Sequence, residues 1–296
     1  MRILLTGKSG QVGGELQRIL ATIGETAAMN RNELDLSKPD QIRHTVRHFR
    51  PKLIVNAGAY TAVDKAESEP EIARAVNGIA PGILAEEART AGAVLIHYST
   101  DYVYSGEARA RPYLETDSTD PASVYGKTKL EGDLAIEESG VPHLIFRTSW
   151  IYGREGKNFL RTILRLAGEQ EELRVVDDQI GTPTWCRSIA ESTGKIVGQL
   201  LKRGGSSFPE TVAEVSGIYH MTCGGRTSWH GFARSILDLA DPTPQPQLVG
   251  IPTKDYPTPA CRPAYSVLSN AKLKATFDIV LPDWEETLRY CLRSDV

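Results

Sequence analysis

The sequence has few cysteines and no long apolar segment. Only four cysteines occur among 296 residues, and no two of them form a CxxC pair. Such scattered cysteines are typical of free thiols in a reducing compartment, and they argue against a disulfide framework or a zinc cluster. No apolar run approaches the roughly 18 residues that suggest a membrane span. The N-terminus does not resemble a signal peptide, so we expect a cytoplasmic protein.

The sequence also lacks blocks of like charge, internal repeats and low-complexity segments. The net charge is −3, with charged residues making up 24% of the chain. This pattern argues against a nucleic-acid binder and against a membrane-surface protein. With 41% apolar residues, the composition is that of an ordinary globular enzyme, large enough for one α/β domain with a smaller lobe.

The beginning of the chain has the pattern strand, glycine turn, helix. Residues 2–6 read RILLT, and helical spacing starts at Gln11. Between them lie Gly7, Gly10 and Gly13, with G-x-x-G-x-x-G spacing. Glycines here permit a tight turn, close approach of the backbone to a pyrophosphate, and close packing of helix and strand. The pattern predicts a dinucleotide site at the helix N-terminus.

The residues after the second expected strand, 25–29, bear on which dinucleotide binds. Asn30 and Arg31 stand where sites selective for NAD usually place an acid, and an arginine there tolerates a 2′-phosphate. They favour NADPH, while Glu33 and Asp35 keep NADH open. After the third expected strand, 53–56, the small residues of AGAYT (57–61) would let a cofactor lie close to the backbone.

The order of elements predicts the fold. Expected strands at 2–6, 25–29, 53–56, 94–98 and 143–147 alternate with helices, which implies a Rossmann-like, doubly wound parallel sheet of the α/β class. Beyond Trp150 the alternation breaks, with helices expected at 158–167 and 187–201 and a strand at 218–221. We expect residues 1–150 to form the cofactor domain. Residues 151–296 would be mainly a smaller C-terminal substrate-binding lobe, with some segments returning to the first domain.

Tyr125 and Lys129 form the candidate catalytic pair. A free phenol has a pKa of about 10, and Lys129 lies one helical turn away on the same face. Its charge should lower the Tyr125 pKa. In carbonyl reduction Tyr125 would protonate the developing alkoxide, while Thr100 or Ser99, at the end of the fourth strand, would hold that oxygen. The Tyr-x-x-x-Lys spacing is common by chance, so its position after the fourth strand carries the prediction.

Several segments together resemble the extended short-chain dehydrogenase/reductase family. They are GKSGQVGGEL, NAGAYTAVDKAE, HYSTDYVY, VYGKTKLEG and FRTSWIYG, followed by NFLRTILRLA, DDQIGTPT, YHMTCGG, YPTPACRPAYSVL and LPDW. The resemblance covers nearly the whole chain. It implies reduction of the C4 keto group of dTDP-4-dehydro-L-rhamnose to dTDP-L-rhamnose, a precursor of cell-surface polysaccharide such as lipopolysaccharide O-antigen, with NADPH or NADH as cofactor.

The resemblance also implies roles for particular residues. Tyr125 would be the proton donor, Lys129 would bind the nicotinamide ribose, and Thr100 would tune the proton transfer. Thr100, Asp101 and Trp150 would contact the sugar, and Arg262 would face the substrate diphosphate. From the glycine pattern and the resemblance together, the cofactor-binding residues are Gly7, Gly10, Gln11, Val12, Gly13, Asn30, Arg31, Asp35, Leu36, Ala59, Tyr60, Thr61, Tyr125 and Lys129.

The sequence departs from the family in one respect. Some members build a magnesium-linked dimer from glutamates, one of them near Glu15. In this chain the second acidic position lies in TPTWCRS and is taken by Arg187. A cation cannot replace a carboxylate ligand, so we predict no metal, and both a monomer and a homodimer stay open.

Two other functions stay open at this point. One is a sugar-nucleotide epimerase or dehydratase of the same superfamily, although a dehydratase would need a further acid where Tyr102 follows Asp101. The other is a non-catalytic regulator that resembles the β subunit of methionine adenosyltransferase. Trp150 and the PTPACRP segment favour the reductase.

Overall fold

The computed structural model describes residues 1–203 and 206–293. Its centre is a six-stranded parallel sheet with the order β10-β5-β4-β3-β1-β2. The strands are β1 (Arg2–Thr6), β2 (Glu25–Met29), β3 (Leu53–Asn56), β4 (Val94–Thr100), β5 (His143–Thr148) and β10 (Gly217–His220). This order confirms the predicted doubly wound α/β fold, and the chain changes direction across the sheet beside β1, where such folds bind ligands.

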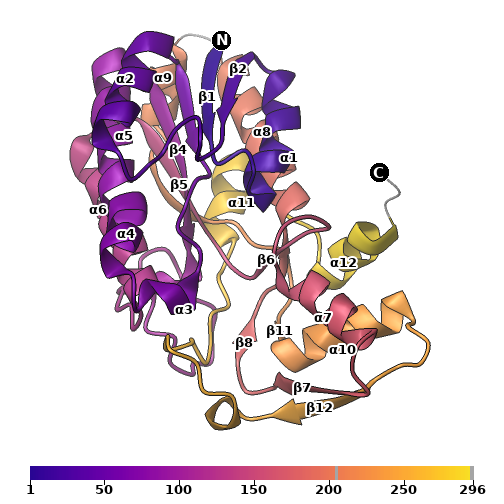
Figure 1. Ribbon diagram of the computed structural model, residues 1–296. Helices are drawn as coiled ribbons and strands as arrows, with labels where there is room; N and C mark the ends of the chain where they lie inside the picture. The colour runs from indigo at the N-terminus through magenta and orange to yellow at the C-terminus, as the bar shows by residue number, and fades with distance from the viewer. Residues whose placement is uncertain (204–205, 294–296) are drawn as a thin grey trace.

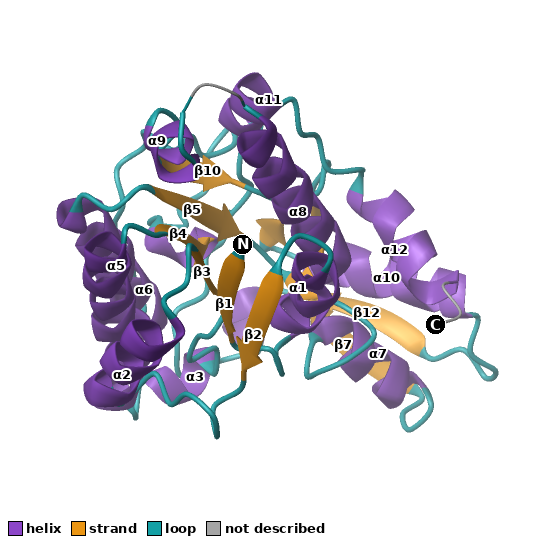
Figure 2. Cartoon of the chain, turned by 90° about the horizontal axis from the view of Figure 1, so that it is seen from above, coloured by secondary structure: helices purple, strands orange, loops and turns teal. Residues whose placement is uncertain are grey.

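Helices cover both faces of the sheet (Figures 1 and 2). On one face lie α1 (Gln11–Ala21) and α8 (Cys186–Lys202), and on the other lie α2 (Pro39–Phe49), α5 (Ala80–Ala91) and α6 (Val124–Ser139). The core on the α1 side includes Leu16 and Ile189, and the core on the α2 side includes Ile42 and Leu84. Because both faces are covered, β3 and β4 are buried over their whole length.

The connection from β3 to α5 contains three short helical pieces. They are α3 (Val63–Ala66), α4 (Pro70–Arg74) and η1 (Ala75–Ile79), of which η1 is a π-helical turn. The buried Asn77 of η1 accepts a hydrogen bond from the Tyr60 N–H at 2.8 Å and donates one to the Tyr60 carbonyl at 3.0 Å. The π-helical turn therefore holds the segment that follows β3 in place.

The chain beyond Trp150 divides between the sheet and a smaller group of elements below it (Figure 1). The lower group consists of α7 (Phe159–Ala167), α10 (Trp229–Ala240), α12 (Trp284–Arg293) and the parallel pair β7 (Glu172–Val176) and β12 (Gln247–Ile251). In contrast, α8 packs on α1, and α9 (Phe208–Ala213), β10 and α11 (Ala271–Phe277) lie at the β5 edge of the sheet. The expected strand over 218–221 is thus an edge strand of the main sheet.

Several helices begin where the sequence offers a side-chain cap. Ser123 Oγ accepts a hydrogen bond from the Gly126 N–H at 3.1 Å at the start of α6, and Ser228 Oγ accepts one from the Gly231 N–H at 3.0 Å at the start of α10. Such caps satisfy N–H groups that have no partner within the helix. The α6 cap matters for the site because Tyr125 lies in the first turn of this helix.

Two global features complete the fold. None of the helices in residues 1–203 and 206–293 has both the length and the apolar character that crossing a bilayer requires. The four cysteines are free, with Cys186, Cys223 and Cys291 buried and Cys261 exposed.

Candidate active site

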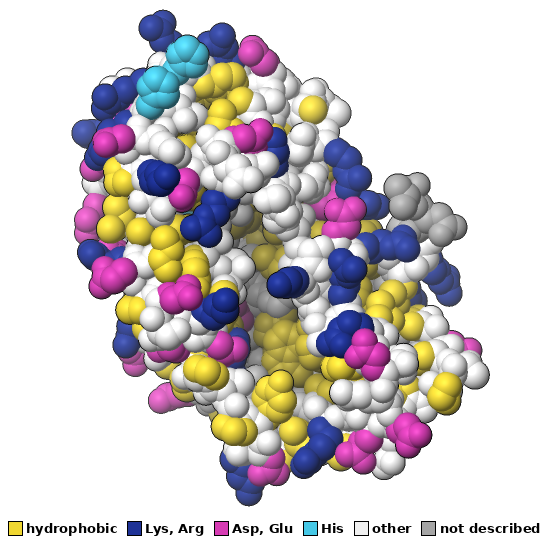
Figure 3. All heavy atoms as spheres, viewed as in Figure 1, with side chains coloured by type: hydrophobic (Ala, Val, Ile, Leu, Met, Phe, Trp, Pro, Cys, Tyr) yellow, Lys and Arg dark blue, Asp and Glu magenta, His cyan; other side chains and the backbone are white. Residues whose placement is uncertain are grey.

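A cavity of about 420 Å³ lies at the carboxyl ends of β1, β3 and β4. Figure 3 shows the molecule hollowed between its upper and lower parts. Of the residues predicted to bind the cofactor, all except Gly13 and Asn30 line this cavity. The residues predicted for the substrate, namely Thr100, Asp101, Trp150 and Arg262, lie outside its lining. The cavity therefore gathers most of the residues predicted to bind the cofactor, with Tyr125 and Lys129 among them.

The glycine turn is shaped by two close backbone contacts. Gly7 has a φ of +74°, and a Cβ on it would lie 2.6 Å from the Gly58 nitrogen. A Cβ on Gly13 would lie 2.0 Å from the Gly7 carbonyl oxygen. Side chains at these two positions cannot be accommodated without moving the backbone. Gly13 therefore brings α1 close to the turn without lining the cavity, and the N-terminus of α1 faces the space where a pyrophosphate would bind.

The part of the cavity that follows β2 is lined by residues of both charges. Arg31 and Asp35 line it, whereas the Glu33 carboxylate bonds to Lys8 Nζ at 2.8 Å and to the Asn30 N–H at 2.8 Å. The hydrogen bond from the Asn30 N–H and the nearby Lys8 lower the Glu33 pKa. Glu33 is thus held away from a ribose, and Arg31 is the cation that can meet a 2′-phosphate.

Asn30 directly follows β2, as expected, and does not line the cavity. Its Oδ1 accepts hydrogen bonds from the N–H groups of Asn32 at 2.9 Å and Glu33 at 3.3 Å, so the side chain stabilises its own turn. Asparagine after a strand is well suited to this Asx-type turn. Its contribution to the cofactor site is to shape the loop that carries Arg31.

Some residues of the cavity were missed by the sequence reasoning. Lys157 and Gly156 line it from a loop that precedes α7. Asn158 fixes this loop against α1, because its Nδ2 donates to Gln11 Oε1 at 2.8 Å. Gly58 lines the cavity as well, and a Cβ there would lie 2.7 Å from Leu36 Cδ1. Gly58 belongs to the segment 57–61 that was expected to lie against a cofactor, whereas nothing in the sequence placed Lys157 across from the glycine turn.

Tyr125, which lines the cavity, contacts Thr100, which lies outside the lining. Tyr125 comes from the first turn of α6, and Thr100 is the last residue of β4. Burial raises the Tyr125 pKa, while a hydrogen bond with the Thr100 side chain acts in the opposite direction. The expectation that Lys129 lowers the Tyr125 pKa is wrong for this structure, because burial prevails and the lysine has other partners. The phenol is therefore protonated at neutral pH, the form that can donate a proton.

Lys129 is fully buried, on the same face of α6 as Tyr125. Its Nζ lies 2.6 Å from the Tyr98 carbonyl oxygen and 3.0 Å from His97 Nε2. Burial lowers the Lys129 pKa to about 8, and the Asp133 charge one turn further along α6 acts against this shift. The amino group faces β4 and at the same time lines the cavity.

Ser99 and Thr100 have separate partners. Successive residues of a strand point to opposite faces, and Ser99 Oγ donates to Asp133 Oδ2 at 2.9 Å. Arg147 Nε of β5 lies 3.1 Å from the same carboxylate oxygen. The Ser99 hydroxyl is thus tied into a buried ion pair, whereas the Thr100 side chain is the one that contacts Tyr125.

Asp101 follows Thr100 and is almost completely buried. Its Oδ1 accepts a hydrogen bond from Thr100 Oγ1 at 3.0 Å, while its Oδ2 has no hydrogen-bond partner within residues 1–203 and 206–293. Burial raises the Asp101 pKa to about 6, although hydrogen bonds from Ser266 and Thr100 act against it. An unsatisfied carboxylate oxygen next to Thr100 is an acceptor that a sugar hydroxyl could use.

Trp150 lies between β5 and the lower elements and has a left-handed backbone, with φ of 45°. Its indole stacks on Trp229 at the start of α10, with ring centroids 3.5 Å apart and planes 5° apart. Gly181 lies against the ring so closely that a Cβ there would be 2.4 Å from it. The stack gives a rigid aromatic surface on the lower lobe.

Arg262 is already paired within the protein. Its guanidinium bonds to Asp64 Oδ2 at 2.5 Å and to the Tyr102 hydroxyl at 3.1 Å. The Tyr102 ring packs edge to face against Tyr125, with centroids 5.5 Å apart. Arg262 therefore joins the proline-rich segment to α3 and to Tyr102, the neighbour of Tyr125. A role with the diphosphate would require it to share or leave Asp64.

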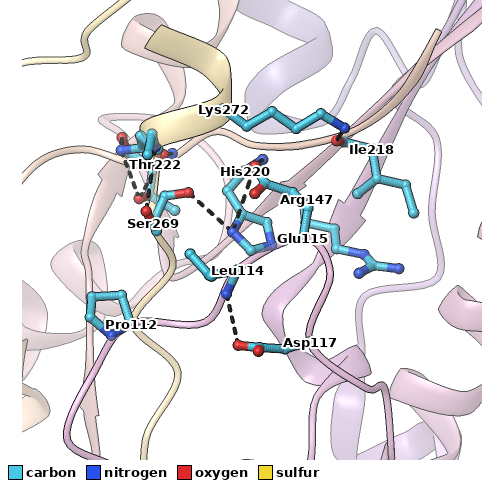
Figure 4. A network of polar contacts seen from close by, with 12 residues as sticks. Pro112, Leu114, Glu115, Asp117, Arg147, Ile218, His220, Thr222, Ser269 and Lys272 are labelled. Atoms are coloured by element: carbon cyan, nitrogen blue, oxygen red, sulfur yellow. Dashed lines mark hydrogen bonds and ion pairs between the residues drawn. The ribbon is translucent and has the colours of Figure 1, made fainter. Parts of the chain in front are cut away.

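The segment between η2 (Asp101–Val103) and α6 is anchored to the β10 edge of the sheet. Figure 4 shows His220 of β10 between Glu115 and Ser269. The His220 N–H donates to Glu115 Oε1 at 2.9 Å, and its Nδ1 lies 3.2 Å from the Ser269 carbonyl oxygen. Tyr104 OH contacts His220 Nε2 at 2.7 Å. These bonds fix the segment that leads from Thr100 to Tyr125.

Arg187, which stands where some family members have a second glutamate, is paired with Glu15 of the same chain. Arg187 Nε lies 3.3 Å from Glu15 Oε2, and Arg18 binds the same carboxylate oxygen at 2.7 Å. Two cations thus neutralise Glu15. Within residues 1–203 and 206–293, no group of three or more histidines, cysteines, aspartates or glutamates could hold a metal ion.

The comparisons with known proteins agree with this geometry. The family model described as RmlD substrate binding domain matches residues 1–296. The chain belongs to this family. A dTDP-4-dehydrorhamnose reductase of Burkholderia thailandensis is 48% identical over 300 residues, which cover 99% of this chain and 98% of the relative.

Solved structures extend the likeness to three dimensions. A dTDP-4-dehydrorhamnose reductase from Clostridium acetobutylicum superimposes with a TM-score of 0.89 at 35% identity, covering 99% of this chain and 98% of that one. A second, from Bacillus anthracis in complex with NADP, has a TM-score of 0.89 at 32% identity, covering 98% of both chains. The family membership confirms the resemblance predicted from the sequence.

Proposed function

We propose that this protein is an oxidoreductase that reduces the C4 keto group of dTDP-4-dehydro-L-rhamnose with NADPH, giving dTDP-L-rhamnose. The observation that carries the proposal is the arrangement of one cavity: Tyr125 and Lys129 line it together with the glycine turn of β1 and α1. The names of the relatives at high identity over nearly the full chain support the substrate. The solved relative with NADP supports the cofactor.

The residues present fit a dinucleotide. The bare backbone of Gly7 and Gly58 leaves a cradle that Cβ atoms would fill, and α1 starts without an acidic side chain in its first turn. Arg31 and Lys157 are cations that line the cavity. NADPH bound there supplies a hydride. Arg31 would meet the 2′-phosphate, and Lys157 would approach the pyrophosphate from the opposite side.

The chain's own groups would perform the proton transfer. Tyr125, protonated at neutral pH, donates its proton to the oxygen that becomes the C4 hydroxyl. Thr100, in contact with the phenol, orients this proton, and its hydroxyl hydrogen, which is donated to Asp101 Oδ1, would turn to the phenolate oxygen to stabilise the negative charge left on Tyr125. Lys129 lies one turn further along α6, where its remaining N–H can bind the nicotinamide ribose.

The substrate would lie between the cavity and the lower elements. Asp101 offers an unsatisfied carboxylate oxygen, and the stacked indoles of Trp150 and Trp229 offer an apolar wall. We assign the lobe formed after Trp150 mainly to substrate binding, with Arg262 toward the diphosphate if it shares Asp64.

One assay separates this function from the alternatives. Purified protein is mixed with dTDP-4-dehydro-L-rhamnose and NADPH, and the absorbance of reduced nicotinamide is followed. We expect the wild type to oxidise NADPH and Tyr125→Phe to abolish this oxidation. Tyr256→Phe, a change at an exposed tyrosine, should leave it intact. Sugar conversion without net NADPH consumption would indicate an epimerase or dehydratase. NADPH binding with no sugar conversion at all would favour a non-catalytic regulator.

A further inference from the structure

A row of buried polar side chains crosses the otherwise apolar sheet beneath the cofactor cavity. Thr6 pairs in register with Asn56, and Asn56 pairs with His97, on the adjacent strands β1, β3 and β4. Each of the three is 1% exposed. The preceding row on the same strands consists of Leu5, Val55 and Ile96. Buried polar groups persist in a sheet only when they are hydrogen-bonded.

The row forms a continuous hydrogen-bonded chain. Thr6 Oγ1 donates to Asn56 Oδ1 at 2.6 Å, and Asn56 Nδ2 lies 3.0 Å from His97 Nδ1. His97 Nε2 lies 3.0 Å from Lys129 Nζ. At the other end, the Gly58 N–H donates to Thr6 Oγ1 at 3.2 Å. The chain thus begins at a backbone turn that lines the cofactor cavity and ends at the amino group of Lys129.

We propose that His97 is a positioning residue that holds Lys129 for the reaction, an inference that rests on the proposed function. The amino group ends a flexible four-carbon stem, and its three hydrogens need acceptors when it is buried. The Tyr98 carbonyl and His97 Nε2 take two of these directions from the β4 side. One direction is left for a ligand hydroxyl in the cavity. His97 therefore determines where Lys129 points.

The histidine can serve either protonation state of the lysine without becoming charged. When Lys129 is an ammonium group, it donates to Nε2, and the hydrogen then on Nδ1 requires the Asn56 amide to turn so that its oxygen, which otherwise accepts from Thr6, faces the ring. When Lys129 is a neutral amine, it accepts from Nε2–H, and the Asn56 amide nitrogen donates to Nδ1. Burial and the Lys129 charge hold the His97 pKa well below its usual range. His97 thus changes tautomer instead of charge.

The other charged and titratable groups around Lys129 are few. Asp133 follows it by one turn of α6 and is bound by Arg147 of β5, while Tyr125 precedes it by one turn. Asp133 favours the ammonium form. The Asp133 carboxylate binds Arg147 and Ser99. The direct hydrogen-bond partners of Lys129 Nζ are the Tyr98 carbonyl and His97.

The test replaces His97 and compares it with a second buried histidine. His97→Leu removes both ring nitrogens, and His97→Gln keeps one polar group at the reach of Nε2. The control is His143→Leu on β5, where Nδ1 lies 2.8 Å from the Val141 carbonyl oxygen, away from the site. Circular dichroism checks folding, a fluorescence titration gives the NADPH Kd, and kcat is measured from pH 6 to 10.

We expect His97→Leu to lower kcat and weaken NADPH binding by about 10- to 100-fold, the effect of losing one hydrogen bond to a charged group. The alkaline limb of its pH profile should also move. His97→Gln should recover part of both quantities, and His143→Leu should keep the wild-type pH profile. The proposal is overturned if His97→Leu keeps the wild-type kcat, Kd and alkaline limb, or if His97→Gln folds and recovers nothing. Absence of turnover in the wild type would contradict the proposed function instead, and the NADPH Kd series would still test His97.

Discussion

The buried ion pair between Asp133 and Arg147 allows a sharp prediction about stability. The two side chains are 0% and 3% exposed, and Arg147 Nε lies 3.1 Å from Asp133 Oδ2. Arg147 also donates to the Tyr104 hydroxyl at 3.0 Å. Asp133→Asn keeps the shape of the side chain and removes its charge. Arg147 would then stay buried with no opposite charge in contact.

The magnitude follows from the burial of both partners. Removing one member of a buried pair costs about 3–5 kcal/mol, because the remaining charge is uncompensated. Burial raises the Asp133 pKa even though Arg147 and Lys129 act against this shift. The pair as a whole is therefore a weak source of stability, and the double variant Asp133→Leu with Arg147→Met should recover most of the loss.

Urea unfolding of the wild type and the variants gives the free energies. The matched control is Glu169→Gln, which removes the charge from an exposed pair with Arg165, with side chains 52% and 59% exposed. Exposed pairs contribute about 0–1 kcal/mol. We expect Asp133→Asn to lose at least three times as much stability as Glu169→Gln. Equal losses for the two variants would refute the reasoning.

Three further predictions concern the cofactor site. Arg31→Ala should raise the KM for NADPH about tenfold and leave the KM for NADH nearly unchanged, since only the 2′-phosphate contact is lost. Steady-state assays in which the two KM values rise equally would contradict this assignment. Gly13→Ala should weaken NADPH binding and destabilise the fold by about 1–3 kcal/mol, because its Cβ would lie 2.0 Å from the Gly7 oxygen. Gly14→Ala is the control, since its Cβ would meet the nearest atom at 3.6 Å, and calorimetry that ranks the two equally would count against the close-approach argument. Burial lowers the Lys129 pKa to about 8 from 10.5, so between these pH values the unfolded chain binds more protons than the folded chain. The wild type should therefore gain stability relative to Lys129→Met as the pH rises through that window, by at most about 1.4 kcal/mol per pH unit. A constant difference in urea unfolding across pH 7–10 would show that Lys129 titrates normally.

The sheet could be predicted well because its signal is local. Most of the first five strands are short, largely apolar runs between turn residues, and residues 53–55 are apolar on both faces because helices cover both sides. Strands of two residues, such as Ile151–Tyr152 and Thr184–Trp185, are too short to show any period. The π-helical turn at Ala75–Ile79 also has no recognisable pattern, because its spacing arises from the insertion of an extra residue.

The candidate site was predictable where backbone geometry dictates the residue type. Gly7 adopts a positive φ, which favours glycine, and the glycines around it in the sequence were enough to predict a turn. The partners of Lys129 were not predictable, because His97 and Tyr98 reach it from a strand some 30 residues earlier. For the same reason the direction of the Tyr125 pKa was predicted wrongly. Helical spacing shows which side chains share a face, but it does not show which of them the surrounding protein buries.

The return of β10 to the sheet has a consequence for how this chain can be divided. All six residues of β5 are buried, and β10 covers its outer edge through parallel pairing from Gly217 to His220. A fragment that ends near residue 150 would leave that apolar edge open, and open edges of this kind pair with other chains and aggregate. During synthesis the same edge would stay uncovered until residue 220 had emerged. Protein made without the second half should therefore accumulate as insoluble material, even though it contains every residue of the glycine turn and the Tyr–Lys pair.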